Sequence, residues 1–320
     1  MNHASSFLAW VQWLSDHSLA VTLAMALVAV AIEGLWRVRG RRANQTMIPP
    51  SPAVTDPWVS TWLTNGALLA CAVALSWLLS PWLSPVFSDA LSGRMGLLAW
   101  LGADQFSFAI HVVLGILLLD LLTYGLHRVM HVVPVLWRVH QVHHSDTEMN
   151  ASTQFRQHPL QLIATIAMQL PLVWLLGIPG FSWVLYAVLS AALELWHHST
   201  VRLPTGLDRW LSFVVVTPQF HRTHHHPERR LHDANYGAVF PLWDHLLGTV
   251  ASAPVNATTG LNAWIPDKTG RTLSLATCLL MPFQRARAAA VPSGGKLAAT
   301  MTARKHKAQQ KFQTIDGGKS

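Results

Sequence analysis

The sequence is poor in charged residues and in cysteine. Of its 320 residues only 12% are charged, whereas 51% are hydrophobic and the mean hydropathy is +0.30. This composition is too apolar for an ordinary soluble domain and predicts an integral membrane protein. The two cysteines, Cys71 and Cys278, lie in apolar surroundings, which excludes a disulfide framework and a thiolate metal site. Any metal ligands must therefore be nitrogen or oxygen atoms.

The apolar residues gather in runs. The first run, 19–36, has no basic residue before it and no small-residue cleavage site after it, so we expect a retained anchor rather than a signal peptide. Further runs are 63–83, 106–126, 160–176 and 183–196. About twenty apolar residues cross a hydrocarbon core of ~30 Å, so the sequence predicts an all-α, multi-pass bundle of four or five membrane helices. A Gly-Ile-Pro-Gly turn joins the last two runs into a hairpin, and the second of them, at about fourteen residues, is expected to be tilted, partly buried or re-entrant.

Histidine, in contrast, is abundant and clustered. Twelve of the eighteen histidines fall between His127 and His226, and eight of them form three boxes: His127-Arg-Val-Met-His131, His140-Gln-Val-His143-His144 and His221-Arg-Thr-His224-His225. Residues three or four apart share one helix face, so the imidazoles of a box can converge on one ion. Imidazole suits zinc, copper, iron and nickel, so ligand type does not name the metal. Eight histidines exceed the three or four that a single zinc needs, and two metals sharing them is the simplest arrangement.

Positive charge indicates the orientation of the chain. The net charge is +8, and four arginines, at positions 37, 39, 41 and 42, follow the first apolar run. The positive-inside tendency places them in the cytoplasm and the N-terminus outside. If the hairpin dips outward and returns, the three boxes and the pair His197-His198 lie together on the cytoplasmic side, under a helical cap formed by the polar chain after Val201. No basic patch is interleaved with exposed aromatic residues in a soluble domain, so we expect no nucleic-acid partner.

The boxes and their flanking residues resemble the fatty acid hydroxylase/sterol desaturase superfamily. The resemblance covers residues 106–249 and is carried by Asp120-x-x-x-Tyr124-x-x-His127-Arg-x-x-His131, Leu136-Trp-Arg-x-His140-x-Val-His143-His144-Ser, Glu148-Met-Asn, His158-Pro, His198-Ser, Thr217-Pro-x-x-His221-Arg-x-His224-His225, Asn235-Tyr-Gly and Trp243-Asp. It implies a membrane-embedded non-haem diiron oxidoreductase that uses molecular oxygen and electrons from a redox partner. Members of the superfamily hydroxylate or desaturate fatty acyl, sterol, carotenoid or ether-lipid substrates.

The resemblance also implies a set of metal ligands. These are the eight box histidines, His127, His131, His140, His143, His144, His221, His224 and His225, together with His198. The superfamily has a histidine before Ser-Asn at the position of His198, and this chain departs from it with Thr200 in place of the asparagine. Two iron ions are the expected cofactor, with zinc able to replace them in isolated protein, because affinity alone does not favour iron.

Five further residues are candidates for orienting the ligands. Asp120 and Tyr124 share a helix face with His127, where a carboxylate would fix an imidazole tautomer and where Tyr124 would equally serve a structural role. His158 is either a ligand or a residue behind one. Glu194, one turn before His198, would reach the same ion or its water, or else would be a buried acid bonded to a neighbouring histidine. Asn235, in the Asn-Tyr-Gly motif, completes the set, whereas His226 and His232 lie beside a charged loop and are expected to be solvated.

Three functions remain open on these residues. A lipid C–H hydroxylase is favoured, a desaturase on the same cluster is the alternative, and a metal transporter is disfavoured because the boxes gather at one surface instead of lining a path through the membrane. No haem-type or four-cysteine motif is present, so we expect a separate cytochrome- or ferredoxin-type electron donor. The expected domains are N-terminal membrane helices (1–105), the catalytic domain (106–250), and an interfacial segment with a basic, disordered tail (251–320). The compartment would be the inner membrane in a bacterium or the endoplasmic reticulum in a eukaryote.

Reporter fusions test the predicted topology. Fusions after Arg42 and at Ser320 should both report the cytoplasm, because both points follow segments rich in Lys and Arg, which the positive-inside tendency keeps there. A fusion at Asp89 should report the opposite side. If Ser320 proves to be external, the hairpin 160–196 has been misread and the boxes cannot share one face of the membrane.

Overall fold

The computed structural model describes residues 9, 12–14, 16–42, 58–92, 96–102, 105, 107–254, 258–261 and 273–284. Within these residues every regular element is a helix, which confirms the predicted all-α class. The elements in chain order are α2 (Ser18–Arg42), α3 (Trp58–Ala90), α4 (Leu97–Trp100), α5 (Phe108–Val132), α6 (Pro134–His144), the 3-10 turn η2 (Ala151–Phe155), α7 (Pro159–Leu176), α8 (Gly180–His198), α9 (Thr205–Leu211), α10 (Pro218–His224), α11 (Arg229–His232), α12 (Leu242–Leu247), α13 (Leu275–Leu280) and the 3-10 turn η4 (Met281–Phe283). The predictions for the tail after Gln284 lie outside the described residues.

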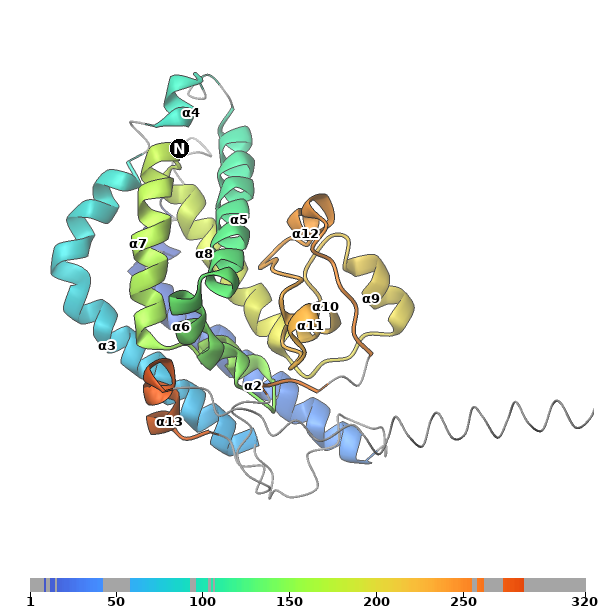
Figure 1. Cartoon of the computed structure of the whole chain (residues 1–320). Coiled ribbons are helices and arrows are strands. Elements are labelled where there is room, and N and C mark those ends of the chain that lie inside the picture. The colour runs from blue at the N-terminus through green and yellow to red at the C-terminus, as the bar shows by residue number, and fades with distance from the viewer. Residues whose placement is uncertain are drawn as a thin grey trace, which may run out of the picture. The chain divides into compact units, whose positions relative to one another are not determined.

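Five helices coincide with the five apolar runs: α2, α3, α5, α7 and α8 (Figure 1). Of these, α3, α5 and α7 are long and apolar enough to cross a membrane, and α2 contains a shorter apolar stretch, Ala20–Leu35. α3 exposes Leu63 and Trp77 by 70% and 75%, as a helix in contact with lipid does. The chain is thus an integral membrane protein, and the count of four or five spans stays a prediction. α8 has 19 residues, more than the run of about fourteen from which it was predicted.

The helices α5, α7 and α8 surround the main apolar core. Leu119, Val173, Ile178 and Tyr186 are buried there against one another and against Val239 of the C-terminal cap. α5 and α8 approach closely at Gly115, where a Cβ atom would overlap the side chain of Ser182. α7 ends at Gly177, whose left-handed conformation (φ 71°) closes the helix and starts the turn into α8. Both hairpin helices are therefore packed on α5.

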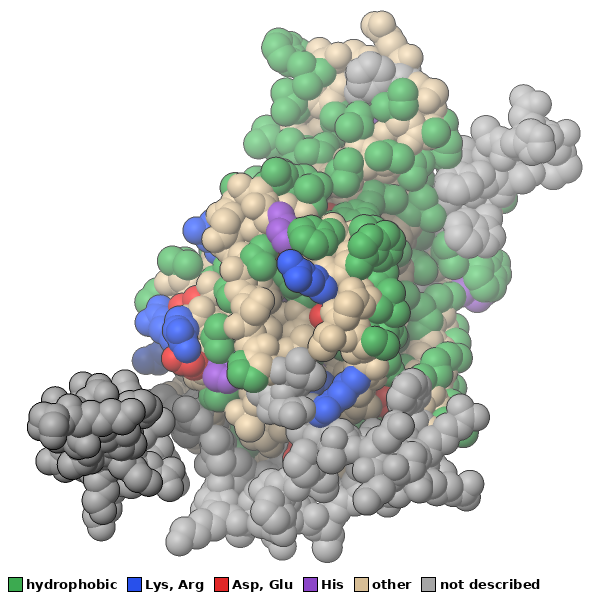
Figure 2. All heavy atoms as spheres, turned by 90° about the vertical axis from the view of Figure 1, so that its right-hand side faces the viewer, with side chains coloured by type: hydrophobic (Ala, Val, Ile, Leu, Met, Phe, Trp, Pro, Cys, Tyr) green, Lys and Arg blue, Asp and Glu red, His purple; other side chains and the backbone are tan. Residues whose placement is uncertain are grey.

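The cap is built from the short helices α9 to α12, as predicted for the polar part of the chain. Charged side chains lie on its surface, and Arg229 and Arg230 there are exposed and paired with Asp233 and Glu228. Figure 2 shows charged side chains across the middle of this view, whereas hydrophobic side chains are more frequent above them. The helix α10 makes its main contacts with the C-terminal part of the bundle through α8.

A buried polar network fixes the N-terminal helices to the region of the boxes. The guanidinium of Arg156, fully buried, donates from Nε to Val142 O and Ser145 Oγ and from Nη1 to Asn65 Oδ1 of α3. Asn65 in turn donates to Ser152 Oγ at 2.9 Å. A buried charge is tolerated only when it is well hydrogen-bonded, so this network joins α3 firmly to the C-terminal end of α6, which carries the second box.

Glu33 gives α2 a similar role. It is 1% exposed, and its Oε1 accepts hydrogen bonds from Ala151 N at 3.0 Å and Thr200 N at 2.8 Å. These two amides lie shortly after His144 and His198, respectively. Thr200, the position that departs from the superfamily pattern, is thus held through its backbone by a carboxylate of the first apolar helix.

Asp120, in the middle of α5, attaches the cap to the bundle. Its carboxylate is fully buried and accepts four hydrogen bonds: from Tyr186 Oη, Trp243 Nε1, Val239 N and Phe240 N. Three of these donors belong to the cap. Asp120 was expected to orient a histidine, but its bonds fix the cap loop and do not reach a histidine.

Replacing Asp120 tests this attachment. Asp120→Ala leaves four buried donors without an acceptor, and each such group costs ~1–3 kcal/mol, so we expect the unfolding temperature to fall by more than about 5 °C, with a smaller fall for Asp120→Asn, which keeps one acceptor. Ser80→Ala is the control, because Ser80 is exposed and bonds only within its own helix. An Asp120→Ala protein that unfolds at the wild-type temperature would show that the carboxylate does not hold the cap.

Candidate metal centre

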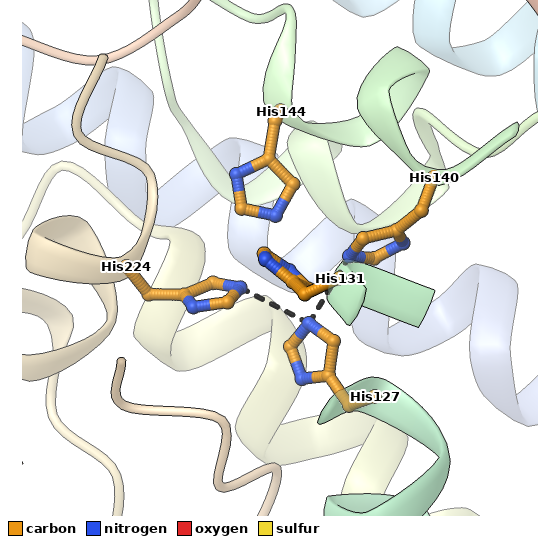
Figure 3. Close-up of side chains that lie close together, drawn as sticks. All are labelled: His127, His131, His140, His144 and His224. Carbon is orange, nitrogen blue, oxygen red and sulfur yellow. Dashed lines mark hydrogen bonds between the residues drawn. The ribbon is translucent and has the colours of Figure 1, made fainter. Parts of the chain in front are cut away.

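Four helices bring nine buried or half-buried histidines together. They come from the C-terminal ends of α5 and α8 and from α6 and α10, and their ring nitrogens form two groups in which all potential ligand atoms lie within 4.8 Å of one another. The first histidine group is His127, His131, His140, His144 and His224 (Figure 3), and the second histidine group is His143, His198, His221 and His225. These are the nine residues that the sequence singled out as ligands, and the structure places all of them at one end of the bundle.

The two groups do not follow the three boxes. In each box the residues four apart stay together: His127 with His131, His140 with His144, and His221 with His225. The residue three positions after the first, His143 or His224, belongs to the opposite group. Each of the last two boxes therefore contributes to both groups, which ties the two sites to the same pair of helices.

In the first histidine group, hydrogen bonds define which ring nitrogen carries the proton. His127 Nδ1 donates to Tyr236 O at 2.8 Å and His224 Nδ1 donates to Ala234 O at 2.7 Å. A carbonyl oxygen only accepts, so both Nδ1 atoms are protonated and, in the neutral ring, both Nε2 atoms carry lone pairs. These two Nε2 atoms nevertheless lie 3.0 Å apart.

Two lone pairs at that distance repel each other unless a cation lies between them. His131 and His140 add to the effect, because their Nδ1 atoms bond to Asp233 Oδ1 (3.2 Å) and Gln161 Oε1 (3.1 Å), which directs their Nε2 atoms inward as well. Nitrogen ligands at about 2.0–2.1 Å from a common ion are about 3 Å apart, which matches this spacing. The donor set of the first histidine group therefore fits a metal ion.

The second histidine group has the same chemistry but fewer fixed rings. Its Nε2 atoms are close together, with His143 to His198 at 3.2 Å, His198 to His221 at 3.0 Å and His221 to His225 at 3.2 Å. Only His198 has a defined proton, since its Nδ1 donates to Glu194 O at 2.7 Å. The Nδ1 atoms of His143, His221 and His225 are buried without a hydrogen-bond partner among the described residues. A metal ion bound by the converging Nε2 atoms would relieve the repulsion of their lone pairs, whereas these three Nδ1 atoms would still have no partner among the described residues.

Burial keeps these rings neutral. The pKa values of the three histidines of the second box and the three of the third box lie well below the usual range, first because burial penalises the charged form and second because neighbouring histidines oppose another positive charge. A neutral imidazole is the form that binds a metal, so the site is already in its ligand form at neutral pH.

Two residues that the sequence analysis missed hold rings of the first histidine group. Asp233 accepts from His131 and is itself bound by Arg229 Nε at 2.8 Å, and Gln161 accepts from His140. Such partners fix the tautomer and orientation of a ligand. Asp233 stands two residues before the Asn-Tyr-Gly motif, a position that could have drawn attention, whereas nothing in the sequence marks Gln161.

The five residues expected to orient ligands act in different ways. Tyr124 bonds to Thr249 Oγ1, which donates to Asp244, and Asp244 holds the amides of Tyr236 and Gly237, so Tyr124 supports the loop whose carbonyl binds His127. Asn235 adopts a left-handed conformation (φ 55°) and holds the same loop through Phe220 O and both backbone groups of Ala251.

Of the other two, Glu194 lies at the cavity beside the histidine groups and His158 does not line it. Glu194 offers its backbone carbonyl to His198, while its side chain bonds to Gln154 and lines the cavity described below. His158 is outside both groups: its Nδ1 caps α7 by accepting from Leu160 N, and its Nε2 donates to Leu279 O. Both of its nitrogens are thus used by the fold.

Two other histidines differ from expectation. His232 is not solvated, as the sequence suggested, but is 7% exposed, stacked on Trp137, and donates from Nδ1 to His226 O. His197, which the sequence analysis did not assign, is 1% exposed, and its ring centroid lies 4.0 Å from that of His221. The charged residues beside His232 suggested exposure to solvent, but the folding of the cap buries this histidine.

A cavity of about 280 Å³ lies beside both groups, between α5, α7 and α8. His127, His140, His143 and His198 contribute to its wall, so ligands of both groups face the same space. The cavity extends into the membrane bundle, because Thr165 and Gln169 of α7 and Trp183 of α8 also line it. A lipid entering from the bundle would reach the histidines through this space.

Metal analysis of single variants tests the two groups separately. We expect about two ions per wild-type chain, and about one ion in His224→Ala and in His143→Ala, which remove one ligand from the first and the second group, respectively. The ion of the second group should be the first to leave in a chelator, because fewer of its rings are fixed by hydrogen bonds and such bonds raise metal affinity about 10–100-fold.

The control is His245→Ala, which removes an exposed histidine outside both groups and should keep two ions. Two ions in His224→Ala, or one ion in the wild type, would contradict the assignment of two sites.

Comparison with known proteins gives this site a context. Residues 112–249 match the family model described as fatty acid hydroxylase. Ornithine lipid hydroxylase OlsE of Rhizobium tropici is 33% identical over 229 residues, which are 70% of this chain and 64% of that protein. Human alkylglycerol monooxygenase is 34% identical over 126 residues, which are 39% of this chain and 27% of that protein. Human cholesterol 25-hydroxylase is 27% identical over 148 residues, which are 46% of this chain and 53% of that protein. No solved structure matches the chain significantly.

The chain spans less than two thirds of the length of each of these relatives. The matched segment nevertheless contains all nine histidines of the two groups and every residue that lines the cavity. By this segment the chain belongs to the fatty acid hydroxylase family.

Proposed function

We propose that this protein is a membrane-bound, oxygen-dependent lipid hydroxylase whose two histidine groups hold two iron ions. One observation carries the proposal: two sets of buried, neutral imidazoles face a single cavity inside a bundle of membrane helices. The relatives support it, because those cited above are named as hydroxylases or as a monooxygenase. Two iron ions bound there would supply the oxidising chemistry that lets molecular oxygen react with an unactivated C–H bond.

The protein residues have three tasks in this reaction. The backbone carbonyls of Tyr236, Ala234 and Glu194 hold ligand rings in the tautomer that binds metal. The cavity between α5, α7 and α8 positions a lipid against the histidines, so that the reacting carbon is held close to the metals. Burial of the ligands keeps bulk water away and protects a reactive site from side reactions. Electrons are supplied by a separate cytochrome- or ferredoxin-type protein.

The site is proposed to face the cytoplasm. Three observations agree with this: the basic residues that follow the first apolar run, the location of all nine histidines at one end of the bundle, and the charged surface of the cap. An electron donor in the cytoplasm would approach from this side.

Labelled oxygen distinguishes hydroxylation from desaturation. In cells that produce the protein and grow under ¹⁸O₂, we expect a membrane lipid that gains one labelled oxygen atom, because hydroxylation cleaves one C–H bond and inserts oxygen. Mass spectrometry of lipid extracts measures the product, and cells that produce His224→Ala are the control. A product lighter by two hydrogens and without the label would instead identify a desaturase on the same histidines.

A further inference from the structure

Polar side chains form a wall along the cavity beside the histidine groups. Gln161, Thr165 and Gln169 lie on one face of α7, because they are four residues apart, and all three line the cavity. Ser190 and Glu194 line it from α8 with the same spacing. Both helices of the hairpin therefore place polar side chains on a cavity that apolar residues, such as Trp183 and Ala187, also line.

The position of this wall is unusual for a membrane helix. α7 is one of the three helices long and apolar enough to span, and its side chains other than those of Gln161, Thr165 and Gln169 are apolar. Polar side chains in a membrane helix are costly and commonly mark a ligand path in the protein interior. All three polar residues of α7 face the same cavity, so they point to a polar group of the ligand.

The wall starts at the first histidine group and leads away from it. Gln161 is already engaged by His140 at 3.1 Å. Thr165 and Gln169 lie one and two helical turns farther, and at 1.5 Å per residue Gln169 is about 12 Å from Gln161 along the axis. Within the described part of the chain, neither of these two side chains has a hydrogen-bond partner, although both line the cavity.

The charge of the wall limits what can enter. Among the residues that the structure describes, no Lys or Arg lines the cavity, and Glu194 is acidic. Beside Thr165 and Gln169, away from the ions proposed at the histidine groups, a carboxylate or phosphate would lose its hydration without meeting a positive side chain. A plain hydrocarbon chain would cover Thr165 and Gln169 and leave their polar groups without partners, which is also costly.

We propose that the site takes lipids whose reacting part carries an uncharged amide or hydroxyl group, and that this group enters the cavity and hydrogen-bonds to Thr165 and Gln169. The inference rests on the proposed function, because the oxidised C–H bond must lie between this polar group and the histidine groups. Oxidation then takes place within about 12 Å of the polar group and not at the methyl end of a long chain.

Binding of three probe lipids to the purified full chain tests this substrate class. The probes are N-hexadecanoylglycinamide, N-hexadecanoylglycine, which has a carboxylate of nearly the same size in place of the terminal amide, and methyl octadecanoate, which has no N–H donor. In competition against the radiolabelled amide at neutral pH, we expect the amide to bind at least about 10-fold more tightly than either of the others. Equal or tighter binding of the carboxylate or the ester would overturn the proposal.

Variants of nearly unchanged size link the preference to the wall. Gln169→Met and Thr165→Val remove the polar atoms, and each should weaken binding of the amide by about 2–10-fold without weakening binding of methyl octadecanoate. Met168→Leu is the control, since Met168 is the neighbour of Gln169 on α7 and does not line the cavity. Equal losses of affinity for both probes, or no loss for the amide, would show that these polar side chains do not select the ligand.

The binding assay separates this inference from the proposed function, because it does not require oxidation. A wild-type protein that prefers the amide but forms no oxygenated lipid would disprove the function and leave the ligand class standing. A lipid labelled at the methyl end of its chain would support the function and overturn the ligand class.

Discussion

The structure depends on one constraint: several neutral imidazoles must be buried with their Nε2 lone pairs directed at the same point. Each such ring needs an acceptor for its Nδ1 proton, and the protein provides Tyr236 O, Ala234 O, Asp233 and Gln161 for the first histidine group. A cluster of this kind is unfavourable without a cation, because lone pairs oppose one another and burial prevents protonation. The folded protein therefore holds the imidazole rings in the arrangement that a metal ion requires.

Most of the other polar contacts support this geometry from a distance. The loop that carries the carbonyls of Ala234 and Tyr236 is held by Asn235 and Asp244, and the cap containing it is fastened to α5 through Asp120. Glu33 of α2 and the Arg156 network fix the segments that follow the ligands of α6 and α8. Burying these polar groups among the membrane helices costs free energy, and nearly all of the groups position the metal centre or the cavity.

Helical periodicity explains how well the ligand set could be predicted. Residues four apart remain together in one group, as His140 and His144 do, and this pairing is a property of any α-helix. The crossing of His143 and His224 into the opposite group is not, because it depends on how α6 and α10 face each other. The sequence showed which histidines were candidates, and packing decided which ion each would serve.

The sequence by itself determined the all-α membrane class, the nine candidate ligands and the end of the bundle where they meet, because hydropathy and helical spacing are local properties of the chain. Only the tertiary structure revealed Asp233, Gln161 and the buried position of His232, since these depend on contacts between distant segments; Asp233, for example, lies 102 residues from His131. The polar wall of the cavity has the same origin. The spacing of Gln161, Thr165 and Gln169 is visible in the sequence, but which way that face of α7 points was decided by its packing against α3, α5 and α6.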